Sequence, residues 1–205
     1  MRGAAFAILM ALFVTACGNV PGAPDHTYYR MGAMQKLPRA ETPVFVDPLV
    51  VGLFEANGLY ADRALIYALD PEARELRQYH YQLWTDPPTR LLQRRLQAEL
   101  REAALAPLVI DALPASQAAI RIRGEILRFE RVPTTDGGHM ASVVLGLRAN
   151  RPDGTPQVNE IYHADVVAAN SSLLAMADAL FAAVDQIFLQ FHSDLIQSQE
   201  YEHAR

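Results

Sequence analysis

The chain has 205 residues, a formal charge of −5 at neutral pH, 51% hydrophobic residues and a single cysteine. This length fits one domain with a substantial core. The mildly acidic balance argues against a nucleic-acid-binding surface and against tight binding to anionic headgroups. One cysteine allows no intramolecular disulfide, so the fold must be stabilised by packing.

The first seventeen residues have the pattern of a bacterial lipoprotein signal. Arg2 supplies a positive charge, and Gly3 to Val14 form an uncharged apolar run that falls short of the roughly 20 residues needed to span a bilayer. Val14-Thr15-Ala16-Cys17 matches the lipobox, in which a branched aliphatic and two small residues precede the cysteine. The alternative is an ordinary signal peptide with an incidental cysteine.

We therefore predict that residues 1–16 are a signal peptide and that Cys17 carries the covalent N-acyl and S-diacylglycerol lipid. Two or three acyl chains together anchor a protein stably, since each buried CH₂ contributes about 0.8 kcal/mol. Gly18 replaces the aspartate that marks inner-membrane retention in enterobacterial lipoproteins, which favours the outer membrane. No non-covalent cofactor is expected.

The mature chain is expected to begin with a flexible stretch over residues 17–27. Asn19 to His26 contain two prolines and a glycine and almost no apolar residue, which is typical of a linker. A single domain is expected over residues 28–197, beginning with a strand at Tyr28 and Tyr29, and a polar tail over residues 198–205. Removal of Arg2 leaves 17 basic and 23 acidic residues in the mature chain, a formal charge of −6.

The next segments predict strands. Pro43 to Val51 is β-branched and short, with prolines that indicate an edge or an end. Ala64 to Leu69 and Glu75 to Trp84 predict a hairpin, because Tyr79, Tyr81 and Leu83 alternate with polar residues as in a half-buried strand. The alternative is that Asp70-Pro71-Glu72 caps and starts a helix.

A helix is predicted after Asp86, with Asp86 as its cap, Pro87 at its first position and Pro107 as its stop. Its buried stripe consists of Leu92, Leu96, Leu100 and Ala103. Its arginines at positions 90, 94, 95 and 101 lie mostly off that stripe. They form either an anion or partner site or, as we favour, a solvated face with an Arg95–Glu99 pair.

The second half predicts a meander followed by a long helix. Leu108 to Ile110 is a short strand candidate, and three longer strands follow over Ala119–Val132, Met140–Ala149 and Val158–Val167. A change of alternation phase beside Gly124 predicts a β-bulge there. The turns at residues 135–138 and 151–155 contain glycine and aspartate suited to positive φ. Ser171 or Ser172 is expected to cap the final helix, whose apolar stripe is Ala177, Leu180, Phe181, Val184, Ile187, Phe188, Phe191 and Leu195.

Together these elements predict an α/β fold, one sheet with two main helices packed on it. The chain contains no nucleophile elbow, no phosphate loop and no metal-binding histidine pattern. His163 with Asp165 could orient a base, but a surface pair is the favoured interpretation, and His192 with Asp194 is no stronger. Catalysis by dispersed residues is the alternative to the non-enzymatic protein that we expect.

Several motifs together resemble the ABC-type transport auxiliary lipoprotein family, the PqiC-like outer-membrane lipoproteins. They are the lipobox, the Tyr28-Tyr29 entry, the Leu59-Tyr60 pair, the tyrosine-rich strand ending in Trp84-Thr85-Asp86-Pro87-Pro88, the leucine-striped helix and the strand around Gly124. The likeness extends from about Tyr28 to Leu195. It departs at Arg30 and Met31, where the family usually has leucine.

This resemblance implies a three-layer α/β domain with a mixed sheet, similar to anticodon-binding and TolB N-terminal domains. It also implies a lipid-anchored outer-membrane protein facing the periplasm. Its partners would be an MCE-domain protein and an inner-membrane ABC permease that transport lipid. Some relatives form rings, so the resemblance also allows a homo-oligomeric ring. Trp84 is expected to fill the seam between helix and sheet, and no residue is assigned to lipid binding. The alternative function is a periplasmic lipid carrier or a regulatory lipoprotein that activates an envelope enzyme.

Overall fold

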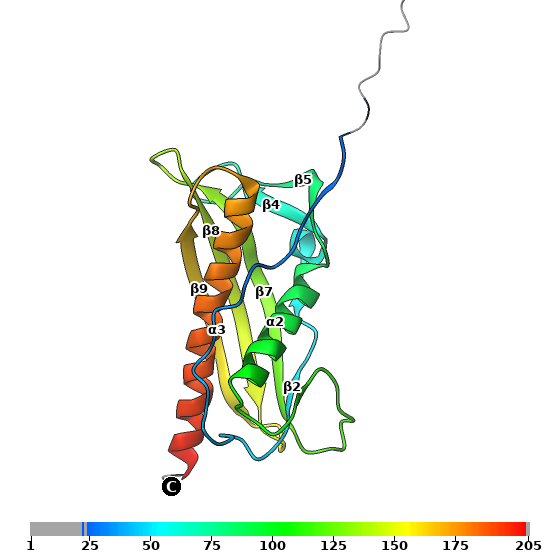
Figure 1. The fold of residues 1–205 in the computed structure, drawn as a ribbon, viewed down its shortest axis with the longest axis vertical. Helices are drawn as coiled ribbons and strands as arrows, with labels where there is room; N and C mark the ends of the chain where they lie inside the picture. The colour runs from blue at the N-terminus through cyan, green and yellow to red at the C-terminus, as the bar shows by residue number, and fades with distance from the viewer. Residues whose placement is uncertain (1–21, 23, 204–205) are drawn as a thin grey trace, which may run out of the picture.

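The long strand β7 (Ile120–Pro133) forms the centre of the sheet in this computed structural model, which describes residues 22 and 24–203 (Figure 1). On one side, β8 (His139–Asn150) pairs with β7 over its whole length, and β9 (Pro156–Val167) pairs with β8. Both pairings are antiparallel, so the predicted meander is confirmed.

The other side of β7 is shared by three short parallel strands. β2 (Leu49–Val51) pairs with its start, β3 (Glu55–Ala56) with its middle and β4 (Ala64–Ala68) with its end. β5 (Leu76–Trp84) pairs antiparallel with β4, and β1 (Thr27–Tyr29) pairs parallel with β5. β6 (Val109–Ile110) pairs parallel with β2. A 3₁₀ turn, η2 (Gly58–Ala61), precedes β4. The predicted strand at Tyr28 and Tyr29 and the predicted hairpin are confirmed.

Two long helices, α2 (Pro88–Glu102) and α3 (Leu173–His203), lie side by side on one face of the sheet (Figure 1). Residues 30–48, which we call the N-terminal segment, contain neither helix nor strand and cross the outer side of the helix pair. The order of layers is therefore sheet, helix pair and N-terminal segment. The predicted class, a single α/β domain with a mixed sheet and two main helices, is confirmed.

The core lies between α3 and the long strands. All eight residues of the predicted α3 stripe are buried, with exposed fractions of 0–3%. Leu173–Glu200 is apolar enough to cross a membrane by length and composition, but 56% of its most apolar window is buried inside the fold. Trp84 is 1% exposed and its ring lies 5.6 Å from that of Phe129 and 5.3 Å from that of Phe181. Trp84 therefore fills the helix–sheet seam as predicted.

The predicted strand Pro43–Val51 is only partly correct, because regular pairing is confined to Leu49–Val51. The Phe45 backbone N–H donates instead to the carbonyl of Leu105, 2.9 Å away, and the Phe45 ring is 1% exposed. Pro43 and Pro48 have no N–H to donate to a ladder, so the chain reaches the sheet as an irregular, packed segment.

The phase change in β7 is confirmed, but its bulge lies between Ile126 and Arg128 and not beside Gly124. Gly124 has a different role. A Cβ added there would overlap Cε2 of Phe54, so the buried Phe54 ring occupies the space that any side chain would need. The glycine is therefore a packing requirement.

Both ends of α2 differ in detail from the prediction. Pro87 occupies the N-cap position without a side-chain cap, and Asp86 instead accepts a 3.1 Å hydrogen bond from Arg94. The helix ends before Pro107, since Ala104 takes φ 55° and its N–H donates to the carbonyl of Arg101. This left-handed residue, with the N–H of Leu105 donating to Leu100, is a Schellman ending.

The predictions for α3 and for the two turns between the long strands mostly hold. Ser172 caps α3, because its Oγ accepts from the N–H of Ala175 at 3.1 Å. The two predicted turns take positive φ at Gly137 and Gly154, whereas the aspartates beside them accept hydrogen bonds and do not adopt positive φ. α3 continues as helix to His203, past the expected start of the polar tail.

Candidate functional site

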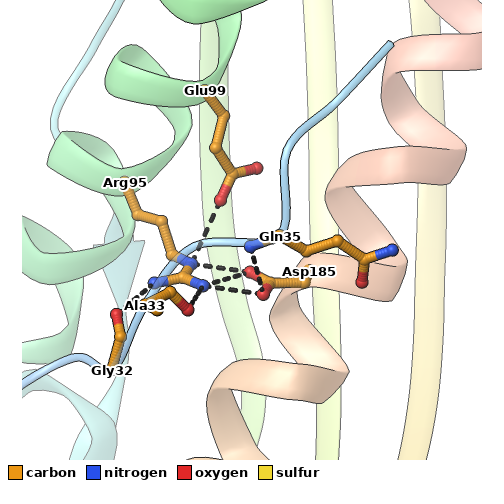
Figure 2. A network of polar contacts seen from close by, with 6 residues as sticks. All are labelled: Gly32, Ala33, Gln35, Arg95, Glu99 and Asp185. Atoms are coloured by element: carbon orange, nitrogen blue, oxygen red, sulfur yellow. Dashed lines mark hydrogen bonds and ion pairs between the residues drawn. The ribbon is translucent and has the colours of Figure 1, made fainter.

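A buried charge network holds the N-terminal segment against the two helices (Figure 2). Arg95 of α2 donates from Nε to Oδ1 of Asp185 at 2.6 Å and from Nη2 to Oδ2 at 2.7 Å, a bidentate pair across the helices. The same guanidinium lies 5.5 Å from the centre of the Phe181 ring. Arg95 and Asp185 are 1% and 6% exposed, so this ion pair lies in the core.

The N-terminal segment supplies the remaining partners of this pair. Arg95 donates to the carbonyls of Gly32 and Ala33 at 3.4 and 3.2 Å. Asp185 Oδ2 in turn accepts from the backbone N–H of Gln35 at 3.1 Å. The hydrogen bonds of Arg95 therefore reach both α3 and the N-terminal segment, which are far from α2 in the chain. Such a network specifies one arrangement of α2, α3 and the N-terminal segment.

Glu99 completes the network as its second carboxyl group. Its Oε1 lies 3.1 Å from Nε of Arg95, whose single proton is directed to Asp185. Glu99 is 2% exposed, and burial together with the neighbouring charge of Asp185 raises its pKa from 4.5 to about 8. At neutral pH the protonated form of Glu99 therefore dominates, and one arginine is balanced by one aspartate.

A second contact fixes the N-terminal segment further along α3. The buried His192 ring donates to the carbonyl of Pro38, and burial lowers the pKa of His192. Gln35 and Pro38 are three residues apart, about 10 Å in an extended chain. Asp185 and His192 are seven apart, also about 10 Å along a helix. The segment therefore lies extended along α3 before Ala40 bonds to Ala103 beyond α2.

The predicted Arg95–Glu99 pair thus forms, but the prediction that it lies on a solvated face is wrong. The arginine that is paired in solvent is Arg94, whose side chain is 57% exposed beside Asp86. The anion or partner site considered for these arginines gains no support at Arg95, because its donors are occupied by the protein itself.

The face of the sheet opposite the helices is a second candidate surface. Alternate residues of β7, β8 and β9 are buried toward the helices, so the intervening residues point the other way. They line a depression of about 650 Å³. Its charged and apolar lining includes Glu55, Arg123, Glu125, Leu127, Arg148 and Ile161. With Ile161 70% exposed, this face has the mixed chemistry of a docking surface.

The other predicted pairs have no catalytic arrangement. His163 Nε2 lies 3.0 Å from Asp165 Oδ1 with both side chains largely in solvent, which confirms the surface pair. Asp194 does not meet His192 but accepts a 2.6 Å hydrogen bond from the hydroxyl of Tyr162. Among the described residues no three His, Cys, Asp or Glu side chains gather as metal ligands. Cys17 lies outside the described residues.

The comparisons with known proteins decide the family. A model of the family described as "ABC-type transport auxiliary lipoprotein component" matches residues 59–191, most of the folded domain. The chain belongs to this family. The matched range of this auxiliary lipoprotein includes the Leu59-Tyr60 pair, whose tyrosine hydroxyl donates to the buried Glu130, and the Trp84–Pro88 segment.

Solved structures show the same fold. The auxiliary lipoprotein is similar to protein XCC0632 from Xanthomonas campestris, a DUF330 protein, with a TM-score of 0.74 and 16% identity over 87% of this chain and 100% of that chain. An uncharacterized protein matches with a TM-score of 0.65 and 15% identity over 84% of this chain and 99% of that one. No curated protein matches this chain.

Proposed function

We propose that this auxiliary lipoprotein is anchored in the outer membrane by lipid on Cys17, faces the periplasm and has no enzymatic role. It would dock or stabilise a periplasm-spanning MCE-domain protein that works with an inner-membrane ABC permease in lipid transport. The observation that carries the proposal is the family match over residues 59–191. The lipobox at residues 14–17 supports the anchor.

The use that the fold makes of its buried polar groups supports a non-enzymatic role. Arg95 and Asp185 bind each other and the N-terminal segment, Glu99 lies beside Arg95, and Glu130 binds Tyr60. Arg95, Asp185 and Glu130 each connect separate elements of the fold, whereas Glu99 pairs with Arg95 on its own helix. His163 and Asp165, the pair considered as a catalytic base and its orienting group, lie on a strand face in solvent.

The interior of the domain also favours an adaptor over a lipid carrier. A carrier needs a cavity for acyl chains between α3 and the sheet, where instead aromatic rings meet. Phe54 and Phe188 lie 6.4 Å apart, and Tyr162 and Phe191 lie 6.1 Å apart, each edge to face. The 650 Å³ depression lies on the outer face of the sheet and is open to solvent.

We place the docking surface on this open sheet face. Arg123 and Arg148 are directly opposite each other on β7 and β8, and Glu125 and Ile161 lie one step along the same ladder. Glu55 on β3 is directly opposite Glu125, so acidic and basic residues lie together on this face. A partner surface with charges of both signs and an apolar contact for Ile161 would complement this face, which favours a protein over a lipid.

The test is co-purification from detergent-solubilised envelopes with a tag after Arg205. The wild-type chain is expected to retain an MCE-domain protein and an ABC permease, and the Cys17→Ala chain to lose both because it no longer reaches the membrane. A membrane-bound wild-type chain that retains neither would overturn the proposal. A photo-crosslinker at Ile161, with one at Ser116 as control, then tests whether the open sheet face is the docking surface.

A further inference from the structure

Aromatic side chains gather in solvent where the chain enters the fold. The His26 ring lies 5.5 Å from that of Tyr81 and 6.3 Å from that of Tyr28. Tyr28 and Tyr81 are 54% and 38% exposed. The guanidinium of Arg63 lies 5.2 Å from the Tyr28 ring. We call His26, Tyr28, Tyr81 and Arg63 the aromatic patch.

Neither the Tyr28 nor the Tyr81 hydroxyl has a hydrogen bond among the residues that the structure describes. Three other tyrosines differ, since the hydroxyls of Tyr29, Tyr60 and Tyr162 donate to Gln82, Glu130 and Asp194. The ring of Tyr29 also packs against Trp84, 6.3 Å away, whereas Tyr28 on the same strand points outward.

The patch is also the part of the fold nearest to the predicted anchor along the chain. His26 follows Cys17 by nine residues, so an extended linker reaches at most about 30 Å. A flexible linker of this length has a typical span of about 15–18 Å. A patch held so close to a bilayer meets it at a high effective concentration, and weak contacts are then sufficient for binding.

We propose that the aromatic patch contacts the headgroup region of the bilayer that carries the Cys17 lipid, and so sets how the domain is oriented on the membrane. This inference rests on the proposed anchor. Tyrosine suits the boundary because its ring is apolar and its hydroxyl remains hydrated. Arg63 places a cation beside the rings, where it can meet lipid phosphate.

The test uses the full lipidated chain in phosphatidylcholine vesicles. Because Cys17 is the only cysteine and its thiol would be acylated, a single introduced cysteine takes a nitroxide label at one position. Tyr81→Cys places the label in the patch. Ser116→Cys is the control, in an exposed loop that Figure 1 shows at the other end of the domain from the point where the chain enters.

The label at position 81 is expected to be accessible to oxygen, which concentrates in the bilayer, and protected from a water-soluble nickel chelate. The label at position 116 is expected to be accessible to the nickel chelate and less accessible to oxygen. Tyr28→Ser should remove part of that protection. Vesicle-bound protein with equal nickel accessibility at both positions would overturn the patch and leave the anchor intact. Protein that does not float with vesicles would overturn both. Spin–spin broadening at position 81 would show that the aromatic patch contacts a second copy of this chain, which would overturn the proposal that it contacts the bilayer. If Tyr81→Cys does not fold, His26→Cys supplies the same measurement.

Discussion

Arg95→Ala tests whether the buried network is needed for the fold. The change leaves the Asp185 carboxylate, 6% exposed, without its bidentate partner and leaves the carbonyls of Gly32 and Ala33 without donors. Removing one partner of a buried ion pair costs about 3–5 kcal/mol because the other charge remains buried. We expect the free energy of unfolding to fall by that amount.

The neighbouring arginine provides a matched control. Arg94 has the same length and charge on the same helix, but its pair with Asp86 is in solvent, with side chains 57% and 33% exposed. Exposed pairs contribute about 0–1 kcal/mol, so Arg94→Ala should be nearly silent.

Urea unfolding in detergent, followed by the near-ultraviolet signal of Trp84, measures both variants. For a domain of this size, 1 kcal/mol shifts Tm by about 2–4 °C, so Arg95→Ala should lower Tm by roughly 6–20 °C. The reasoning is refuted if the two variants unfold within about 1 kcal/mol of each other.

Four further substitutions test the sequence and the structure at other positions. Because the pKa of Glu99 is raised from 4.5 to about 8, the folded state holds a proton that the unfolded chain releases. This contribution to the free energy of unfolding is complete below pH 4.5 and is lost as the pH rises through 8, at up to about 1.4 kcal/mol per pH unit. Glu99→Gln should flatten this dependence of the unfolding free energy on pH, as measured by urea titrations. Gly124→Ala should destabilise the fold by about 1–3 kcal/mol through overpacking. Gly146→Ala is the control and should lose less stability, because its new Cβ would meet its nearest neighbour at 3.8 Å. Equal melting temperatures for the two variants would contradict the packing role of Gly124. Trp84→Ala should cost about 3–5 kcal/mol, and an unchanged Tm with lost partner binding would show a functional residue instead. Cys17→Ala should move the chain from the membrane to the soluble fraction, and a variant still found with membranes would refute the anchor.

Local patterns were sufficient to predict most of the elements. Alternation along β7, β8 and β9 and the leucine stripe of α2 are short-range signals, and the structure confirms both. Two of the errors lie where proline interrupts a pattern. Pro43 and Pro48 remove ladder donors, and Pro87 occupies the cap position that Asp86 was expected to fill.

The buried position of Arg95 and Glu99 was detectable from helix geometry. At about 100° per residue, Glu99 and Arg95 lie about 20° and 60° from Leu92, on the side away from Leu96 and Leu100. Leu91, which is also buried, lies about 100° from Leu92 on that same side, so both charged residues fall between two leucines. Arg94 lies about 160° away from Leu92 by the same geometry. A charged pair inside a stripe indicates burial with a partner.

The identity of that partner could not be read from the sequence. Asp185 is 90 residues from Arg95, and the carbonyls of Gly32 and Ala33 carry no side-chain signal. Asp185 and His192 lie on one side of α3, about 20° apart around the helix axis. Only the tertiary fold shows that the N-terminal segment covers that side.

Native mass spectrometry of the complex purified from envelopes distinguishes an adaptor from a lipid carrier. We expect a lipidated auxiliary lipoprotein bound to the MCE-domain protein, with acyl mass on the chain only at Cys17. A chain recovered alone, with a phospholipid bound non-covalently inside its fold, would contradict it and establish a carrier instead.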